Sequence, residues 1–243
     1  MLLAATAASA QENPLWMRYP SISPDGSKIA FAYKGDIFCV DVNGGEARQL
    51  TTNPAYDYKP VWSPDGSKIA FASNREGGFD VYVMDARGGE PRRLTTNSAG
   101  EIPVTWRDNN HIVFQSSVMP TAESIIFAGN FVEEYVVDLD GHRPTLFSTL
   151  QMDDISINTR GEVLYHDNKG YEDKWRKHHT SPIARDIWLE KDGTFKKLTS
   201  FAGEDRNPVW AADGESYYYL SEQDGTFNIY INKVAGGSPQ QLT

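Results

Sequence analysis

The densest group of side chains able to do chemistry lies between residues 166 and 185. Its histidines lie near carboxylates, a combination that can bind zinc: His166, His178 and His179, with Asp167, Glu172 and Asp173. Adjacent side chains of an extended chain point to opposite sides, so His178 and His179 cannot both face one ion without a bend. We therefore expect no metal site, and nothing else in the sequence predicts a cofactor.

The same segment concentrates positive charge in a chain whose formal net charge is −10. Aromatic anchors, which often carry interface energy, accompany the basic residues. We expect this segment to contact a peptide or protein partner through Tyr171, Trp175, Arg176, Lys177, His178, His179 and Arg185. The alternative is a solvated charged loop with no partner.

Catalytic signatures are missing from the sequence. It contains no Gly-x-Ser-x-Gly nucleophile elbow, no His-Glu-x-x-His helix motif and no phosphate-binding loop pattern. Asp-Gly pairs recur at the corresponding turns of three repeats, at Asp25, Asp65 and Asp213, so their carboxylates do not converge, whereas calcium needs about six to eight oxygens at one point. We interpret them as turn residues and expect this chain to catalyse no reaction.

Composition and charge narrow the class of protein further. The 243 residues are 40% hydrophobic, enough for a packed core, and the acidic total argues against nucleic acid as a partner. A single cysteine, Cys39, excludes an internal disulfide, and we expect a buried, inert thiol. Residues 1–10 end in Ala-Ser-Ala and are typical of a signal-peptide remnant, which predicts export, with a disordered tail as the alternative. This stretch is too short to insert across a membrane.

An internal repeat organises residues 11–243. The segments 20–31 and 60–71 align almost letter for letter, and weaker copies follow, giving units at about 19–52, 59–96, 102–147, 153–199 and 207–243. Every unit ends near a leucine, and threonine follows four of the five: Leu50, Leu94, Leu146, Leu198 and Leu242.

Each unit has the pattern of four short strands separated by turn residues. In the second unit we expect strands at 60–63, 68–73, 80–84 and 92–95, with Pro64-Asp65-Gly66 as a tight turn. Four strands in a repeat of this length predict an all-β fold, a β-propeller of four-stranded antiparallel blades. Trp62, Trp106 and Trp210 recur at one blade position and are expected to wedge the core.

The topology of a blade also places the long connections. The segments 115–130 and 166–185 both join the second and third strands of a unit, so we expect them to emerge on one face from neighbouring blades. Loops of this length in a compact domain are usually functional or disordered. This face is therefore the expected binding face.

Two sets of residues resemble known families. The string Ser-Pro-Asp-Gly-Ser-Lys-Ile-Ala-Phe-Ala at 63–72, with 80–85 and 91–95, resembles the TolB-like propeller repeat. The stretches 170–188 and 13–20 resemble the propeller of tricorn-like serine peptidases. That resemblance implies a propeller that guides or filters peptides ahead of PDZ and serine-peptidase domains, whose catalytic positions have no counterpart here. It also implies six or seven blades, so the five units are expected to be part of a larger ring.

Three functions follow as hypotheses. The first is the non-catalytic propeller of an exported, periplasmic tricorn-like serine peptidase, which handles peptide substrates or scaffolds its own downstream PDZ and protease domains. The second is a free-standing TolB-like module that binds a protein of the cell envelope. The third is the propeller of a prolyl-oligopeptidase-type enzyme. A ring closed by five blades remains the alternative to a fragment.

Overall fold

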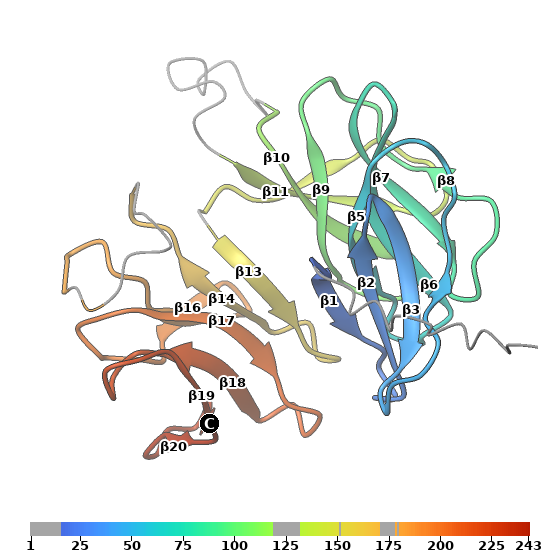
Figure 1. Ribbon diagram of the computed structural model, residues 1–243. Coiled ribbons are helices and arrows are strands. Elements are labelled where there is room, and N and C mark those ends of the chain that lie inside the picture. The colour runs from blue at the N-terminus through green and yellow to red at the C-terminus, as the bar shows by residue number, and fades with distance from the viewer. Residues whose placement is uncertain (1–15, 119–131, 151, 171–177, 179) are drawn as a thin grey trace, which may run out of the picture.

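A computed structural model of the 243-residue chain describes residues 16–118, 132–150, 152–170, 178 and 180–243. Within these residues twenty strands form five antiparallel sheets of four strands each, and each sheet uses four consecutive strands (Figure 1). The expected all-β propeller architecture is therefore confirmed.

Blades 1 and 2 contain the two most similar repeats. Blade 1 consists of β1 (Arg18–Ile22), β2 (Lys28–Tyr33), β3 (Asp36–Asp41) and β4 (Arg48–Gln49). Blade 2 consists of β5 (Asp57–Trp62), β6 (Lys68–Glu76), β7 (Gly78–Asp85) and β8 (Arg92–Arg93). The four strands expected in the second unit are all present. The first begins three residues earlier and ends one earlier than expected, the second and third are longer, and the fourth ends two residues earlier.

Blades 3 to 5 follow the same order. Blade 3 consists of β9 (Glu101–Trp106), β10 (His111–Ser116), β11 (Glu133–Asp138) and β12 (Thr145–Ser148). Blade 4 consists of β13 (Met152–Ile157), β14 (Val163–Asp167), β15 (Ile187–Lys191) and β16 (Thr194–Lys197). Blade 5 consists of β17 (Asp205–Trp210), β18 (Ser216–Ser221), β19 (Asn228–Lys233) and β20 (Gln240–Gln241). The two long connections join β10 to β11 and β14 to β15, as expected.

Turn chemistry explains the repeated Ser-Pro-Asp-Gly-Ser string. The Asp65 carboxylate accepts hydrogen bonds from the Ser63 hydroxyl at 2.6 Å and the Ser67 backbone N–H at 2.9 Å. These bonds, with that of the Ser63 hydroxyl first, lower the pKa of Asp65 to about 2. The carboxylate is thus occupied in holding the turn between the first two strands. The interpretation of these aspartates as turn residues is confirmed at this turn.

The recurring tryptophans join blades 2, 3 and 5 to the blade before each of them. The indole N–H of Trp62 donates to the Ser21 carbonyl in blade 1 at 3.0 Å, and that of Trp106 donates to the Val61 carbonyl in blade 2 at 3.0 Å. Trp210 donates in the same way to a carbonyl of blade 4 at 3.2 Å. Each ring therefore fills an interface and satisfies its one donor across it, which confirms the expected wedge.

The leucine and threonine that end each repeat fasten the outermost strand to the third strand. In blade 2, Leu94 N–H donates to the Val81 carbonyl at 2.8 Å, and the Thr95 hydroxyl accepts from the Val81 N–H at 2.9 Å. We call this pair of bonds the leucine–threonine clasp. It recurs in blades 1, 4 and 5, at Leu50 and Thr51, Leu198 and Thr199, and Leu242 and Thr243.

Apolar clusters fill four junctions between successive blades. At the first junction, Ala30 and Ile37 of blade 1 pack with Ile69 and Phe71 of blade 2, and comparable clusters join blades 2 to 3, 3 to 4 and 4 to 5. Among the described residues no such cluster joins blade 5 to blade 1. Tyr218, on the face of β18 that points away from blade 4, is 37% exposed.

Other sequence expectations are met by single residues. Cys39 is buried in β3, and burial raises the pKa of its thiol, as expected for an inert side chain.

Blade 3 is the least regular copy, because Phe147 replaces the threonine of the clasp and Leu146 remains 42% exposed. In the described part of the chain no helix is long and apolar enough to cross a membrane.

The clasp yields a stability prediction. Thr95→Val preserves the shape of the side chain but leaves the buried Val81 N–H without its acceptor and removes a hydrogen bond to Glu101. We expect the free energy of unfolding to fall by about 1–3 kcal/mol, the cost of leaving a buried polar group unsatisfied. Urea unfolding followed by circular dichroism measures it.

Thr243→Val is the matched control, because Thr243 makes the same bond, at 2.9 Å to the Ile229 N–H, in an exposed position. Water replaces the lost acceptor there, so we expect a loss below about 0.5 kcal/mol. Equal losses in the two variants would show that burial of the clasp is unimportant.

Candidate functional site

The inner strands of the five blades surround one cavity. β1, β5, β9, β13 and β17 lie side by side in chain order, and each contributes lining residues to a cavity of about 490 Å³. We call it the axial cavity. A volume of roughly 300–1,000 Å³ is typical of ligand sites, and a cavity formed by all repeats is a natural place for a shared function.

Four residues at one repeat position form a polar ring around this cavity. Tyr19, Lys59, Asp154 and Asn207 each occupy the same place in the inner strand of blades 1, 2, 4 and 5, and each lines the cavity. Their φ angles lie between 49° and 54°, in the left-handed region. We call these residues the axial ring.

A β-bulge creates this conformation. The pairing of the inner strand with its neighbour shifts register at the ring position in all four blades, between Tyr58 and Val61 in blade 2 for example. A left-handed non-glycine residue costs on the order of 1 kcal/mol, so the surrounding blade must hold it. The bulge places the side chain of each ring residue at the wall of the axial cavity.

Beyond the ring the cavity wall becomes apolar. Ile22 and Val209 line it and are 59% and 54% exposed, and Val61 and Val104 line it from blades 2 and 3. An apolar wall with a few polar groups is the usual composition of a site for organic ligands, since the wall supplies burial and the polar groups supply orientation.

Asp154 is the acidic member of the ring. Its side chain is 52% exposed, and its carboxylate accepts a hydrogen bond from the Asn207 side-chain amide. The positive charge of Lys59 also acts on this carboxylate. Burial raises the pKa of this carboxyl, and the positive charge of Lys59 works against that shift. The carboxylate thus lies among protein atoms on its flanks while the axial cavity keeps it accessible.

His166 supports the ring from behind. It is 4% exposed, its Nδ1 accepts the Asn207 backbone N–H at 3.3 Å, and it lies 3.8 Å from an Asp154 carboxylate oxygen. Burial, and then the nearby charges of Arg185 and Arg206, lower the pKa of His166 to about 3. The imidazole is therefore neutral at pH 7, and Nε2 carries its proton.

A group of aromatic side chains lies beside the axial ring on blades 1 and 2. The rings of Tyr19 and Tyr58 are 5.4 Å apart between centroids, and those of Tyr58 and Phe79 are 5.0 Å apart. Tyr56 joins them and is 43% exposed, and its ring lies so close to Gly35 that a side chain there would meet it at 3.3 Å. Gly35 thus allows this close approach.

The basic segment expected to bind a partner is described only in part. Tyr171, Trp175, Arg176, Lys177 and His179 lie outside the described residues. His178 is exposed, and its backbone N–H donates to Glu222 at 2.9 Å. Arg185 is 9% exposed and forms an ion pair with Glu204 at 3.2 Å, so its charge is paired at the join between blades 4 and 5. A role for the segment in binding stays a prediction.

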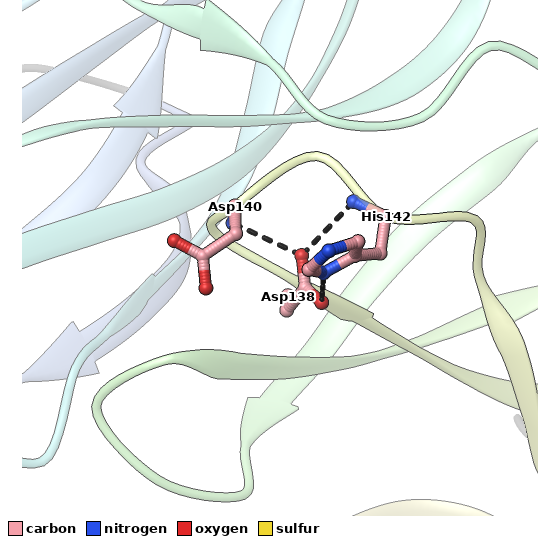
Figure 2. Close-up of side chains that lie close together, drawn as sticks. All are labelled: Asp138, Asp140 and His142. Carbon is pink, nitrogen blue, oxygen red and sulfur yellow. Dashed lines mark hydrogen bonds and ion pairs between the residues drawn. The ribbon is translucent and has the colours of Figure 1, made fainter.

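A different group has the donor types of a metal site. Asp138, Asp140 and His142 lie together in the exposed turn after β11 (Figure 2). Asp138 accepts from the backbone N–H groups of Asp140 and His142, and the His142 ring lies 2.6 Å from its second oxygen. These bonds explain the cluster as a capped turn. The histidines and carboxylates of the segment 166–185, at which we expected no metal site, do not belong to this group as far as the structure describes them.

Comparison with known proteins agrees with this architecture. The family model of the tricorn protease N-terminal β-propeller domain matches residues 14–243. The chain belongs to the tricorn N-terminal propeller family. No curated protein matches the sequence.

Solved structures show the same fold as this tricorn-type propeller at low sequence identity. The tricorn protease crystal structure is 22% identical with a TM-score of 0.73, covering 93% of this chain and 22% of that one. A putative TolB from Agrobacterium tumefaciens is 17% identical with a TM-score of 0.72, covering 93% and 80%. A Mycobacterium tuberculosis puromycin-hydrolyzing peptidase is 15% identical with a TM-score of 0.65, covering 93% and 36%. The chain thus spans about a fifth of the tricorn protease structure.

The axial ring of the tricorn-type propeller was not predicted from the sequence. A signal for it exists, because Tyr19, Lys59 and Asn207 each precede a proline at one position of the repeat where the residue type changes completely. That a β-bulge directs this position to the cavity became evident only from the structure.

The buried imidazole makes stability depend on pH. The pKa of His166 is about 3 in the folded propeller against 6.5 ordinarily, so below pH 6.5 the unfolded chain takes up a proton that the folded chain does not. Between pH 6.5 and 4.5 the wild type should lose about 2–3 kcal/mol of unfolding free energy more than His166→Asn. Urea unfolding of both proteins at each pH measures this difference.

His142→Asn is the control, since the hydrogen bond and charge of Asp138 raise the pKa of the exposed His142. Protonation of that side chain favours the folded state, so its removal should shift the pH dependence in the opposite direction. Parallel pH profiles for His166→Asn and the wild type would contradict a buried neutral imidazole.

Proposed function

We propose that this propeller binds peptides in its axial cavity and thereby guides substrates within a larger peptidase or scaffolds its protease domain. The observation that carries the proposal is the axial ring. Four repeats share one backbone conformation at this position, yet they present four different groups to a single cavity. These are the phenol of Tyr19, the ammonium of Lys59, the carboxylate of Asp154 and the carboxamide of Asn207. Structural positions in a repeat tend to keep their residue type, as the clasp does, whereas these four do not.

The shape of the cavity supports an extended chain as its ligand. The polar ring supplies hydrogen-bond donors and acceptors for peptide groups, and the wall beyond it supplies apolar surface for side chains, including Ile22 and Val209. The exposed rings of Tyr19 and Tyr56 extend this surface on blades 1 and 2. Rigid aromatic side chains of this kind are favourable contacts for peptides because few torsions are frozen on binding.

We propose further that the whole protein is an exported, periplasmic serine peptidase of the tricorn type, in which this chain is a non-catalytic region. Family membership supports this assignment. The uncovered face of blade 5, where Tyr218 and Ile229 are 37% and 39% exposed, supports additional blades that complete a ring of six or seven. The basic segment 166–185 would then contact the peptide or a neighbouring domain.

The second candidate is a free-standing, TolB-like module that binds a protein of the cell envelope. The share of the Agrobacterium tumefaciens putative TolB structure that the chain covers, 80%, favours it. The propeller of a prolyl-oligopeptidase-type enzyme is a third and weaker candidate.

Sequencing the gene beyond codon 243 separates these candidates. The main proposal expects one or two more blade repeats followed by PDZ and serine-peptidase domains. A stop codon soon after position 243 would favour the TolB-like module, and a Gly-x-Ser-x-Gly motif in an α/β-hydrolase pattern would favour the third candidate.

Filling the axial cavity tests peptide binding directly. Val209→Trp places a large ring where a 54% exposed valine lines the cavity, so it should reduce binding of peptides of about three to ten residues by at least tenfold. Saturation-transfer NMR on a mixture of such peptides reports the loss. Val42→Trp, at a 44% exposed position just after β3, is the matched control and should bind as the wild type does.

Three results are possible. Loss in Val209→Trp alone supports the axial cavity as the site. Equal binding by all three proteins would move the site elsewhere, and no binding by the wild type would overturn peptide binding as the function of this chain.

A further inference from the structure

Two opposite charges face the axial cavity without forming an ion pair with each other. Lys59 reaches it from blade 2 and Asp154 from blade 4, on either side of blade 3. The near polar partners of the Asp154 carboxylate are the Asn207 amide and the His166 ring, at 3.8 Å for the latter. Their fields nevertheless overlap, since Lys59 exerts the largest charge effect on Asp154, ahead of Asp153, Arg206 and Arg185.

This arrangement disfavours ligands that carry charge of one sign. A cation gains from Asp154 and loses from Lys59, and an anion does the reverse, so neither gains much net energy. A ligand with a positive and a negative end gains from both groups at once. The remaining ring members, Tyr19 and Asn207, can each donate and accept hydrogen bonds around such a ligand.

The backbone shows that the two charges are not required by the bulge. The same left-handed position holds tyrosine in blade 1 and asparagine in blade 5, so neither an ammonium nor a carboxylate is needed to form it. Lys59 and Asp154 are partly exposed rather than sealed into a blade junction. Their charges are therefore available to a ligand in the cavity.

We infer that the axial ring binds short peptides with free ends, as zwitterions. The peptide ammonium lies at Asp154 with the Asn207 amide, and the peptide carboxylate lies at Lys59. Apolar side chains of the peptide pack on the wall formed by Ile22, Val61, Val104 and Val209. The inference rests on the proposed peptide-binding function and specifies which peptides bind and in which direction.

Four forms of one peptide test the inference. The probe is the tripeptide Ala-Leu-Ala with free ends, with an acetylated amino end, with an amidated carboxyl end, or with both ends blocked. Isothermal titration calorimetry on the 243-residue chain should show that each block weakens binding by about tenfold, as expected when a charge-assisted hydrogen bond is lost. The doubly blocked form should bind weakest.

Two variants test which end of the peptide lies at Asp154 and which lies at Lys59. Asp154→Asn keeps the shape of the side chain, and asparagine tolerates the left-handed conformation, so the fold should be preserved. In this variant acetylation of the peptide should no longer matter, while amidation still does. Lys59→Met should show the reverse pattern. This crossed pattern is not produced by a general loss of folding, and thermal unfolding of each variant confirms its integrity.

Matched controls exist at two turns away from the cavity. Asp192→Asn and Lys34→Met make the same changes at exposed left-handed positions, with φ of 51° and 53°. Both should retain the wild-type response to every form of the peptide. If all four forms bind the wild type equally, peptide binding stands and the zwitterion inference is overturned. If no form binds, the proposed function itself fails for this class of peptide.

Discussion

The structure depends on the burial of apolar sheet faces between successive blades. A single four-stranded sheet in this chain carries apolar side chains on both faces, such as Ile69 and Ala70 on adjacent positions of β6, and both are fully buried. Ile69 packs on blade 1 and Ala70 packs on blade 3. Because each blade needs a neighbour on both sides, the blades must follow one another around an axis, and their inner strands must converge there.

Convergence of the inner strands forms the axial cavity, to which every blade contributes residues. The tryptophan wedges and the leucine–threonine clasps hold each blade by backbone hydrogen bonds, so they allow little variation in residue type. The bulge position on the inner strand is different, because its side chain lines the axial cavity in four of the blades. Repetition of the backbone thus leaves one position per blade free to diversify, and four blades use it for four chemical groups: Tyr19, Lys59, Asp154 and Asn207.

The charge states of the groups beside the axial ring follow from how far each group is enclosed by the blades. His166 is neutral because it is enclosed and because Arg185 and Arg206 lie nearby, and a neutral imidazole can accept the Asn207 N–H that helps to hold the ring. Asp154 remains accessible because the cavity reaches it. Arg185 is buried in an ion pair with Glu204, whereas the charges of Lys59 and Asp154 face the axial cavity.

The amino-acid sequence by itself determined the blades. Strand patterning, the Ser-Pro-Asp-Gly-Ser turns, the tryptophans and the leucine–threonine ends are local or repeated signals, and each was confirmed by the structure. The sequence also led to the segment 166–185 as the candidate site, because clustered charge is visible in one dimension. It did not show that Arg185 is enclosed with Glu204. Only the tertiary structure brought Lys59 and Asp154 to one cavity, because blades far apart in the chain meet solely where their inner strands converge.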